Sequence, residues 1–176
     1  MSALREQLRQ HKGWNKMPQR REHAQSPHRE TEDLWVRYNA LENLHEDYQA
    51  YSGAHDSVWL PDADKLPIAK AICYTLMGLV QAVRLGGVLV TRIPPKKQVY
   101  PHADTGWHPK YYNCKLYLPV DSNEFCINYA GAQDAEEVVN MRTGEVWFMD
   151  NTVRHRVVNS GNEARTTLIV CMRVEP

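Results

Sequence analysis

The spacing of hydrophobic positions changes at Gly86 and Gly87. Before this point, the segment from Leu66 to Leu85 repeats apolar residues every three or four positions, which is typical of an amphipathic helix. Asp64 is placed to cap this helix, Pro67 suits its first turn, and the two glycines would end it. We interpret the apolar stripe as core packing; it consists of Ile68, Ile72, Leu76, Leu79, Val80 and Val83.

After Gly87 the pattern becomes one of short β-strands separated by turn residues. The runs that can be identified are Val88 to Ile93, Val99 to Asp104, Tyr111 to Val120, Phe125 to Tyr129, Glu137 to Met141, Glu145 to Met149, Arg154 to Val158 and Thr166 to Val174. About eight strands at this spacing are typical of a sandwich or barrel, and the jelly roll is an eight-stranded solution. The sequence therefore predicts a mainly β fold with N-terminal helices, namely a double-stranded β-helix of the cupin-like jelly-roll type.

The N-terminal part has a weaker pattern. Residues 1 to about 27 are predicted to be weakly structured, with Pro18 and Pro27 as punctuation. Thr31 to Tyr38 alternates in a way that favours a strand, and Asn39 to Gln49 is polar and helical in pattern. A chain of 176 residues is most simply one domain. We therefore expect 1–86 to supply an arm and buttressing helices, and 87–176 to form the jelly-roll core.

Charge gives no argument for a polyanionic partner, because 21 Lys and Arg balance 21 Asp and Glu. The first thirty residues are more basic, with seven Lys or Arg against three Glu. For this segment we favour a solvated, mobile end over an arm that contacts nucleic acid.

The four cysteines lie far apart and form no Cys-x-x-Cys pair, so we expect buried, reduced thiols rather than a zinc site or a disulfide framework. The chain opens with a polar segment that does not resemble a signal peptide. The longest apolar run, from Ala69 to Val83, is too short and too interrupted to cross a membrane. These features predict a cytoplasmic protein without a membrane partner.

The candidate chemistry begins at His102 and Asp104, which stand two residues apart in a predicted strand. Alternate residues of a strand share one face, so both side chains can be directed at one point. A second histidine from another strand, His155, would complete the two-histidine, one-carboxylate set that binds divalent iron. Considered singly, His102 is more simply interpreted as a surface histidine and Asp104 as a turn-forming residue. In a chain of this composition, a His-x-Asp triplet can also arise by chance.

Arg165, ten residues after His155, could hold the far carboxylate of an organic acid. If His155–Val158 and Arg165–Val170 form a hairpin, the loop length decides which way Arg165 points. An even loop places His155 and Arg165 on opposite faces, whereas an odd loop or a bulge places them on the same face. The interpretation of Arg165 as a ligand-binding residue requires the odd case.

The stretch from Arg92 to Asp104, together with Gly144 to Asn151, His155 to Asn159 and Arg165, resembles the aspartyl/asparaginyl β-hydroxylase branch of the iron(II)/2-oxoglutarate-dependent oxygenases. The resemblance covers roughly residues 88–174 and, more faintly, 26–37. It implies that His102, Asp104 and His155 bind iron(II) as the catalytic centre. It also implies that Arg165 binds the side carboxylate of 2-oxoglutarate, with O2 as the second cosubstrate.

The resemblance also points to the strand from Asn113 to Leu118, where family members place a basic or histidine side chain that assists 2-oxoglutarate. Here Lys115 and Tyr117 share one face, so either could supply that contact; an outward polar face is the alternative. The candidate substrate-binding residues are His28, Arg37, Trp107, His108 and Tyr112, for which surface positions are the alternative.

The implied reaction is hydroxylation of an unactivated C–H bond in an amino acid or peptidyl residue, with decarboxylation of 2-oxoglutarate to succinate. A nucleobase is a minor alternative substrate. A cupin-type metal-binding isomerase and a non-catalytic binding domain stay open as other classes. Arg165 argues against the first, because such an isomerase has no need of it, and the complete His-Asp-His set argues against the second.

Overall fold

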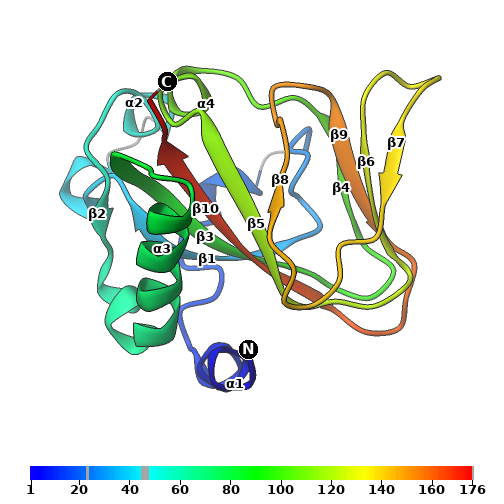
Figure 1. Cartoon of the computed structure of the whole chain (residues 1–176), viewed down its shortest axis with the longest axis horizontal. Coiled ribbons are helices and arrows are strands. Elements are labelled where there is room, and N and C mark those ends of the chain that lie inside the picture. Colours follow the sequence, from blue (N-terminus) through cyan, green and yellow to red (C-terminus); the bar gives the residue numbers. More distant parts are fainter. Residues whose placement is uncertain (23, 45–47, 176) are drawn as a thin grey trace.

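The computed structural model describes residues 1–22, 24–44 and 48–175. Within these residues the strands form a six-stranded and a four-stranded sheet, and every neighbouring pair is antiparallel (Figure 1). In order across the larger sheet lie β2 (Val58–Trp59), β1 (Glu32–Tyr38), β3 (Arg84–Ile93), β10 (Arg165–Arg173), β5 (Cys114–Asp121) and β8 (Trp147–Phe148). In order across the smaller sheet lie β4 (Gln98–His102), β9 (His155–Asn159), β6 (Cys126–Ala130) and β7 (Glu137–Val139).

The mainly β class and the jelly-roll architecture are confirmed. Each run predicted as a strand after Gly87 overlaps one strand of the structure, although the bounds differ. The run from Tyr111 to Val120 is the least regular of them, because the short helix α4 (Trp107–Tyr111) ends where that run begins and β5 starts three residues later. The strand expected from Thr31 to Tyr38 is β1.

The remaining helices belong to the N-terminal half: α1 (Ser2–Gln10), α2 (Tyr48–Tyr51) and α3 (Pro67–Leu79), with short 3-10 helices at Pro18–Arg20, Leu41–Asn43 and Pro61–Lys65. The weak structure predicted for residues 1 to 27 is therefore wrong. Leu4 and Leu8 of α1 are buried in the main core, and this contact holds the first segment on the larger sheet. The prediction for Asn39 to Gln49 falls partly on 45–47, which lie outside the described residues.

The helix α3 ends at Leu79, earlier than the predicted end at Leu85. Its apolar periodicity continues in sequence, but Val83 donates a backbone hydrogen bond to Arg173, which draws the chain into β3. Leu79 and Val83 are consequently 70% and 58% exposed and do not belong to the buried stripe. The buried residues of α3 are Ala69, Cys73 and Leu76.

The N-terminal cap of α3 also differs from the prediction. The helix has no side-chain cap, and the carboxylate of Asp64 instead pairs with Lys70 at 2.7 Å. No helix in the described part of the chain is long and apolar enough to cross a membrane. All four cysteines are buried free thiols, as predicted.

The two faces of the larger sheet bury different kinds of side chain. Even-numbered residues of its central strands pack with α1 and α3 in the main apolar core; they are Val88, Val90, Leu116, Leu118, Leu168, Val170 and Met172. Alternate residues of a strand point to opposite faces. The odd-numbered residues therefore face the smaller sheet, and they include the polar set Thr91, Lys115, Tyr117, Arg165 and Thr167. Polar side chains thus collect between the two sheets.

The hairpin expected between β9 and β10 does not form. β9 pairs with β4 and β6 in the smaller sheet, whereas β10 pairs with β3 and β5 in the larger one. The buried amide of Asn159 stabilises this crossing, because it donates to the carbonyl oxygens of Ile93, Pro94 and Glu163 at 2.8–3.1 Å. Because β9 and β10 are not paired, the length of the loop between them does not decide which way Arg165 points. Arg165 reaches the space between the sheets from the strand opposite His155.

Candidate metal centre and its pockets

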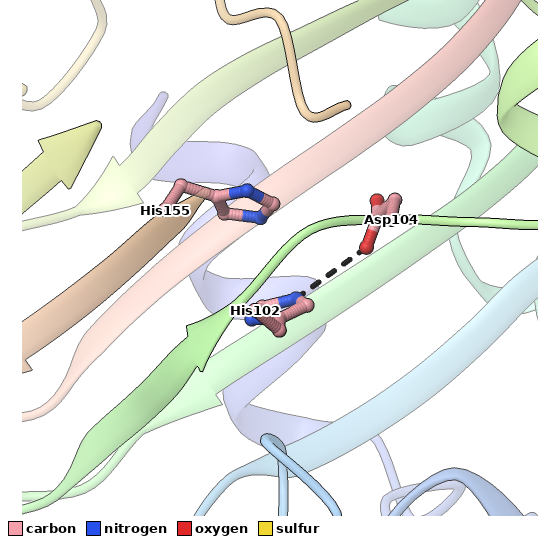
Figure 2. Close-up of side chains that lie close together, drawn as sticks. All are labelled: His102, Asp104 and His155. Atoms are coloured by element: carbon pink, nitrogen blue, oxygen red, sulfur yellow. Dashed lines mark ion pairs between the residues drawn. The ribbon is translucent and has the colours of Figure 1, made fainter. Parts of the chain in front are cut away.

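His102 and His155 lie directly opposite each other on the paired strands β4 and β9, and their ring centroids are 4.3 Å apart (Figure 2). The Nδ1 atom of His102 is 2.8 Å from the carbonyl oxygen of Tyr100, and that of His155 is 2.9 Å from the carbonyl oxygen of Val153. A carbonyl oxygen can only accept, so both Nδ1 atoms carry the proton. Each Nε2 atom is left with the lone pair that a metal ligand needs.

Asp104 lies just past the end of β4, where its backbone N–H donates to the carbonyl oxygen of Asn151 at 2.8 Å. Its Oδ2 atom accepts hydrogen bonds from the Lys115 ammonium at 2.6 Å and from the Asn151 amide. Its Oδ1 atom lies 3.4 Å from Nε2 of His102. One carboxylate oxygen is thus held by the protein and the other faces the histidines.

His102, Asp104 and His155 can each offer one ligand atom, and these atoms lie within 4.8 Å of one another. Two imidazole nitrogens and a carboxylate oxygen on one side of a site, with the other side open, suit divalent iron. The three residues predicted from the sequence are therefore brought together, and their donor atoms fit the group that the resemblance implies.

The charge states also fit metal binding. Burial alone would raise the pKa of Asp104, but the Lys115 ammonium and the hydrogen bonds to this carboxylate hold its pKa below the ordinary range. Burial lowers the pKa of His155 to about 4. At neutral pH Asp104 is therefore ionised and His155 is neutral, which are the states that bind a metal without first losing a proton.

An inner pocket between the two sheets is lined by His102 and His155 and also by Arg165. Arg165 is 2% exposed; its Nη1 atom donates to Oδ1 of Asn128 at 3.0 Å, and its Nη2 atom to the sulfur of Met141 at 3.4 Å. Its Nε atom is buried without a partner. No carboxylate among the described residues forms an ion pair with it. Arg165 is thus a buried cation without a counter-charge, beside the candidate metal ligands.

Lys115 and Tyr117, the candidates for the second cosubstrate contact, both line the inner pocket. The Lys115 ammonium is bonded to Asp104, and its pKa is raised because Tyr117 and Asp104 outweigh the lowering effect of burial. Tyr117 lies opposite Ile169 on the same inner face. Of the two, Lys115 already donates a hydrogen bond to Asp104, the candidate carboxylate ligand of the metal.

An outer pocket with a volume of about 580 Å³ shares His102 and Lys115 with the inner pocket and is also lined by Asp104. Two of the five predicted substrate-binding residues, His28 and His108, line it. Its lining also contains Arg20, Trp35 and Gly87. Burial lowers the pKa of His108 to about 3, so this imidazole is neutral.

The other three candidates, Arg37, Trp107 and Tyr112, lie outside the lining of both pockets. Arg37 donates to the carbonyl oxygen of Leu85 at 3.2 Å. Trp107 stacks on Tyr111 with the ring centroids 4.8 Å apart. Tyr112 is buried against Gly86, where a Cβ atom would meet the tyrosine ring at 2.6 Å.

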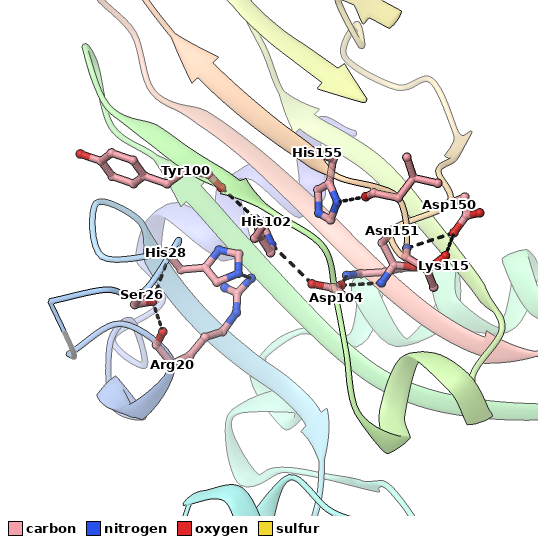
Figure 3. A network of polar contacts seen from close by, with 12 residues as sticks. Arg20, Ser26, His28, Tyr100, His102, Asp104, Lys115, Asp150, Asn151 and His155 are labelled. Carbon is pink, nitrogen blue, oxygen red and sulfur yellow. Dashed lines mark hydrogen bonds and ion pairs between the residues drawn. The ribbon is translucent and has the colours of Figure 1, made fainter. Parts of the chain in front are cut away.

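Arg20 lines both pockets and was missed in the sequence. Figure 3 shows its side chain beside that of His28. Arg20 falls in the basic segment predicted to be solvated and mobile. Instead, its Nη1 atom donates to Oδ2 of the buried Asp33 at 2.7 Å and its Nη2 atom to Nε2 of His28 at 3.0 Å. The His28 ring in turn lies 4.8 Å from the His102 ring. The only sequence signal was a run of basic residues, which does not distinguish Arg20 from its neighbours.

The family model for aspartyl/asparaginyl β-hydroxylases matches residues 4–174. No curated protein matches the chain. Among solved structures, an oxidoreductase of the 2OG-Fe(II) oxygenase family from Burkholderia pseudomallei superposes with a TM-score of 0.60 at 12% identity, covering 84% of this chain and 70% of that one. A cupin domain from Bordetella pertussis Tohama I covers 50% of this chain and 81% of its own, with a TM-score of 0.38 at 12% identity.

Proposed function

Because the chain belongs to the aspartyl/asparaginyl β-hydroxylase family, we propose that it is an iron(II)- and 2-oxoglutarate-dependent dioxygenase. In this proposal it hydroxylates an unactivated C–H bond of an amino acid or of a residue in a peptide. Decarboxylation of 2-oxoglutarate to succinate accompanies the hydroxylation.

The observation that carries the proposal is the state of Arg165. A buried charge without a partner is strongly unfavourable, so such a group is expected to bind an opposite charge. Arg165 lines the same pocket as His102 and His155, and its Nε atom is an unpaired donor. A dicarboxylate such as 2-oxoglutarate would supply the missing counter-charge to Arg165 while its other end lies at the metal.

The chain's own residues would bind and orient the reactants. His102, His155 and Oδ1 of Asp104 would hold iron(II). When bound, the metal activates dioxygen and couples its reduction to the oxidation of 2-oxoglutarate. Lys115 and Asn151 orient the carboxylate of Asp104. Because Lys115 has this role, Tyr117 is the candidate for the second 2-oxoglutarate contact. The apolar lining of the inner pocket, Ile93, Val99, Val157 and Ile169, excludes water from this region.

Two features of the site disfavour the alternative functions. A cupin-type isomerase that uses only the metal ligands has no need of a buried arginine between the sheets. A non-catalytic domain has no need of two histidines whose Nε2 atoms are both left free for a metal.

Four reduced, buried cysteines suit a reducing compartment, and we propose the cytoplasm.

Succinate formation tests the proposal. The purified protein is incubated in air with iron(II) and 2-oxoglutarate, alone and with a panel of amino acids and short peptides. We expect slow succinate release without substrate and faster release with at least one panel member. His155→Ala should abolish both, whereas His55→Ala, a histidine outside both pocket linings, should not. Absence of succinate from the fully loaded wild-type protein contradicts the proposal.

A further inference from the structure

Four side chains that line the outer pocket have a buried polar atom without a hydrogen-bond partner. One is the amide oxygen Oε1 of Gln19, and the other three are nitrogen atoms: Nδ1 of His28, Nε1 of Trp35 and Nε2 of His108. More than about 90% of buried polar groups in proteins are hydrogen-bonded, so unpaired ones call for an explanation. These atoms belong to residues around one pocket beside the metal ligands, which indicates that a polar ligand supplies their missing hydrogen bonds.

Two of these three nitrogens must be donors. An indole N–H can only donate, which settles Trp35. The guanidinium of Arg20 also can only donate, so Nε2 of His28 must accept its hydrogen bond. Because Nε2 accepts this bond, the ring carries its proton on Nδ1. The ligand must therefore offer acceptor atoms to His28 and Trp35.

The balance of charge specifies the ligand further. The cations that line the two pockets are Arg20, Lys115 and Arg165, and the carboxylates in contact with them are Asp33 and Asp104. Among these described groups one positive charge is left over. Iron(II) and the 2-oxoglutarate dianion cancel each other, so the loaded site would keep this excess. A substrate with one negative charge would neutralise it, whereas a phosphate dianion would reverse it.

Several contacts fix the position of Arg20, and Figure 3 shows those with His28 and Ser26. Its partner Asp33 is fixed by Oγ1 of Thr91 at 3.0 Å. The Ser26 hydroxyl donates to the carbonyl oxygen of Arg20 at 2.5 Å and accepts from the backbone N–H of His28 at 3.1 Å. A planar guanidinium with two fixed neighbours and further N–H groups suits the planar carboxylate.

We propose that Arg20, His28 and Trp35 bind a carboxylate of the substrate in the outer pocket. This inference rests on the proposed function, because the charge balance includes iron(II) and 2-oxoglutarate. The His28 ring is 4.8 Å from the ring of the metal ligand His102. The C–H bond that reacts therefore belongs to a carbon only a few bonds from the bound carboxylate.

The test compares matched carboxylates and amides as probes. They are N-acetyl amino acids against their primary amides, and N-acetyl-aspartate amide against N-acetyl-asparagine amide; in each pair only the first member carries a net negative charge. Binding is read from the change each probe produces in the visible absorption of the protein with iron(II) and 2-oxoglutarate without oxygen, and independently from stimulated succinate release in air. We expect at least one carboxylate to bind about tenfold or more tightly than its amide, which corresponds to about 1.4 kcal/mol.

Variants assign that preference to Arg20. Arg20→Lys keeps a cation beside Asp33 but loses the planar fork, and it should weaken carboxylate binding about tenfold while leaving amide binding unchanged. Arg20→Gln should abolish the preference, and His28→Phe should reduce it. The matched control is Arg21→Lys, because Arg21 donates to the carbonyl oxygen of Thr31 and lines neither pocket. It should retain the wild-type preference.

The possible failures are distinguishable. If the wild-type protein gives neither the absorption band nor succinate, the proposed function and this inference both fall. If it gives both but responds to no carboxylate, or to carboxylates and amides alike, only this inference is overturned. A carboxylate preference that survives Arg20→Lys and Arg20→Gln overturns the assignment to Arg20.

Discussion

The ammonium of Lys115 lies 2.6 Å from Oδ2 of Asp104, while Oδ1 of the same carboxylate faces the candidate metal ligand His102. Lys115 thus occupies one oxygen atom and leaves the other for a metal. It also supplies the positive charge that keeps a buried carboxylate ionised, since burial alone would raise the pKa of Asp104.

Replacing Lys115 should therefore move the pH range in which the protein binds metal. In Lys115→Met the effect of burial on Asp104 is no longer offset by a cation, so the pKa of Asp104 rises and protons compete with the metal at higher pH. We expect the acid limb of cobalt(II) binding, followed by absorption spectroscopy, to shift upward. Lys110→Met, at an exposed position of α4, is the control and should match the wild type. Equal midpoints in all three proteins contradict this role for Lys115.

Asn128 should act as a positioning residue for Arg165, because its Oδ1 atom accepts a hydrogen bond from Nη1 of the arginine. Asn128→Leu removes a bond to a charged group, which is worth about 1.5–3 kcal/mol, and lets the guanidinium move. We expect the KM for 2-oxoglutarate to rise by roughly tenfold or more, with a smaller change in kcat. Titration of 2-oxoglutarate in the succinate assay measures both quantities.

Asn140→Leu provides the comparison for this experiment. The Asn140 amide donates to the carbonyl oxygens of Asn123 and Cys126, and its side chain lines neither the inner nor the outer pocket. This variant should lower stability without a selective effect on KM. A similar rise in KM in both variants argues that Asn128 acts only through folding.

The stability of the metal-free protein should fall as the pH falls from about 6.5. Burial lowers the pKa of His108 to about 3, whereas an unperturbed histidine titrates near 6.5. Below pH 6.5 the unfolded chain therefore binds a proton at this position that the folded protein does not bind. Stability is fully present above about pH 6.5 and is lost as the pH falls toward the folded-state pKa.

Urea unfolding in the presence of a chelator measures this loss. For His108 alone it amounts to about 1.4 kcal/mol per pH unit between pH 5.5 and 4.5. His155 should add a loss of the same sign, since burial lowers its pKa to about 4. His108→Gln should reduce the slope of unfolding free energy against pH by about 1.4 kcal/mol per unit. If the slope of the variant equals that of the wild type, His108 is not held neutral.

The strands were predictable because their signal is local. Apolar alternation and turn residues identify a strand wherever it later pairs, and each run predicted after Gly87 overlaps one strand of the structure. Features that depend on distant contacts were not predictable. α1 is held by the burial of Leu4 and Leu8 against the sheet, and α3 ends because β10 draws the following residues into β3.

The candidate site shows the same division. The metal ligands were predictable, because histidine and aspartate are common metal ligands and the His-x-Asp spacing is visible in the sequence. The structure brings the donor atoms of His102, Asp104 and His155 together. The proximity of Arg165 was expected from a hairpin, but it arises because consecutive strands lie in opposite sheets. Nothing local distinguishes Arg20 from the basic residues around it, since its role depends on Asp33, His28 and a pocket that only the fold creates.

The most direct test of the central claim is the visible charge-transfer band of the protein mixed with iron(II) and 2-oxoglutarate without oxygen. We predict a weak band in the wild type, its loss in His102→Ala, and about a tenfold or greater increase in the 2-oxoglutarate concentration needed to form it in Arg165→Met. A band that persists in His102→Ala would contradict only the assignment of that ligand. The absence of a band from the wild-type protein at saturating iron(II) and 2-oxoglutarate would contradict the account as a whole.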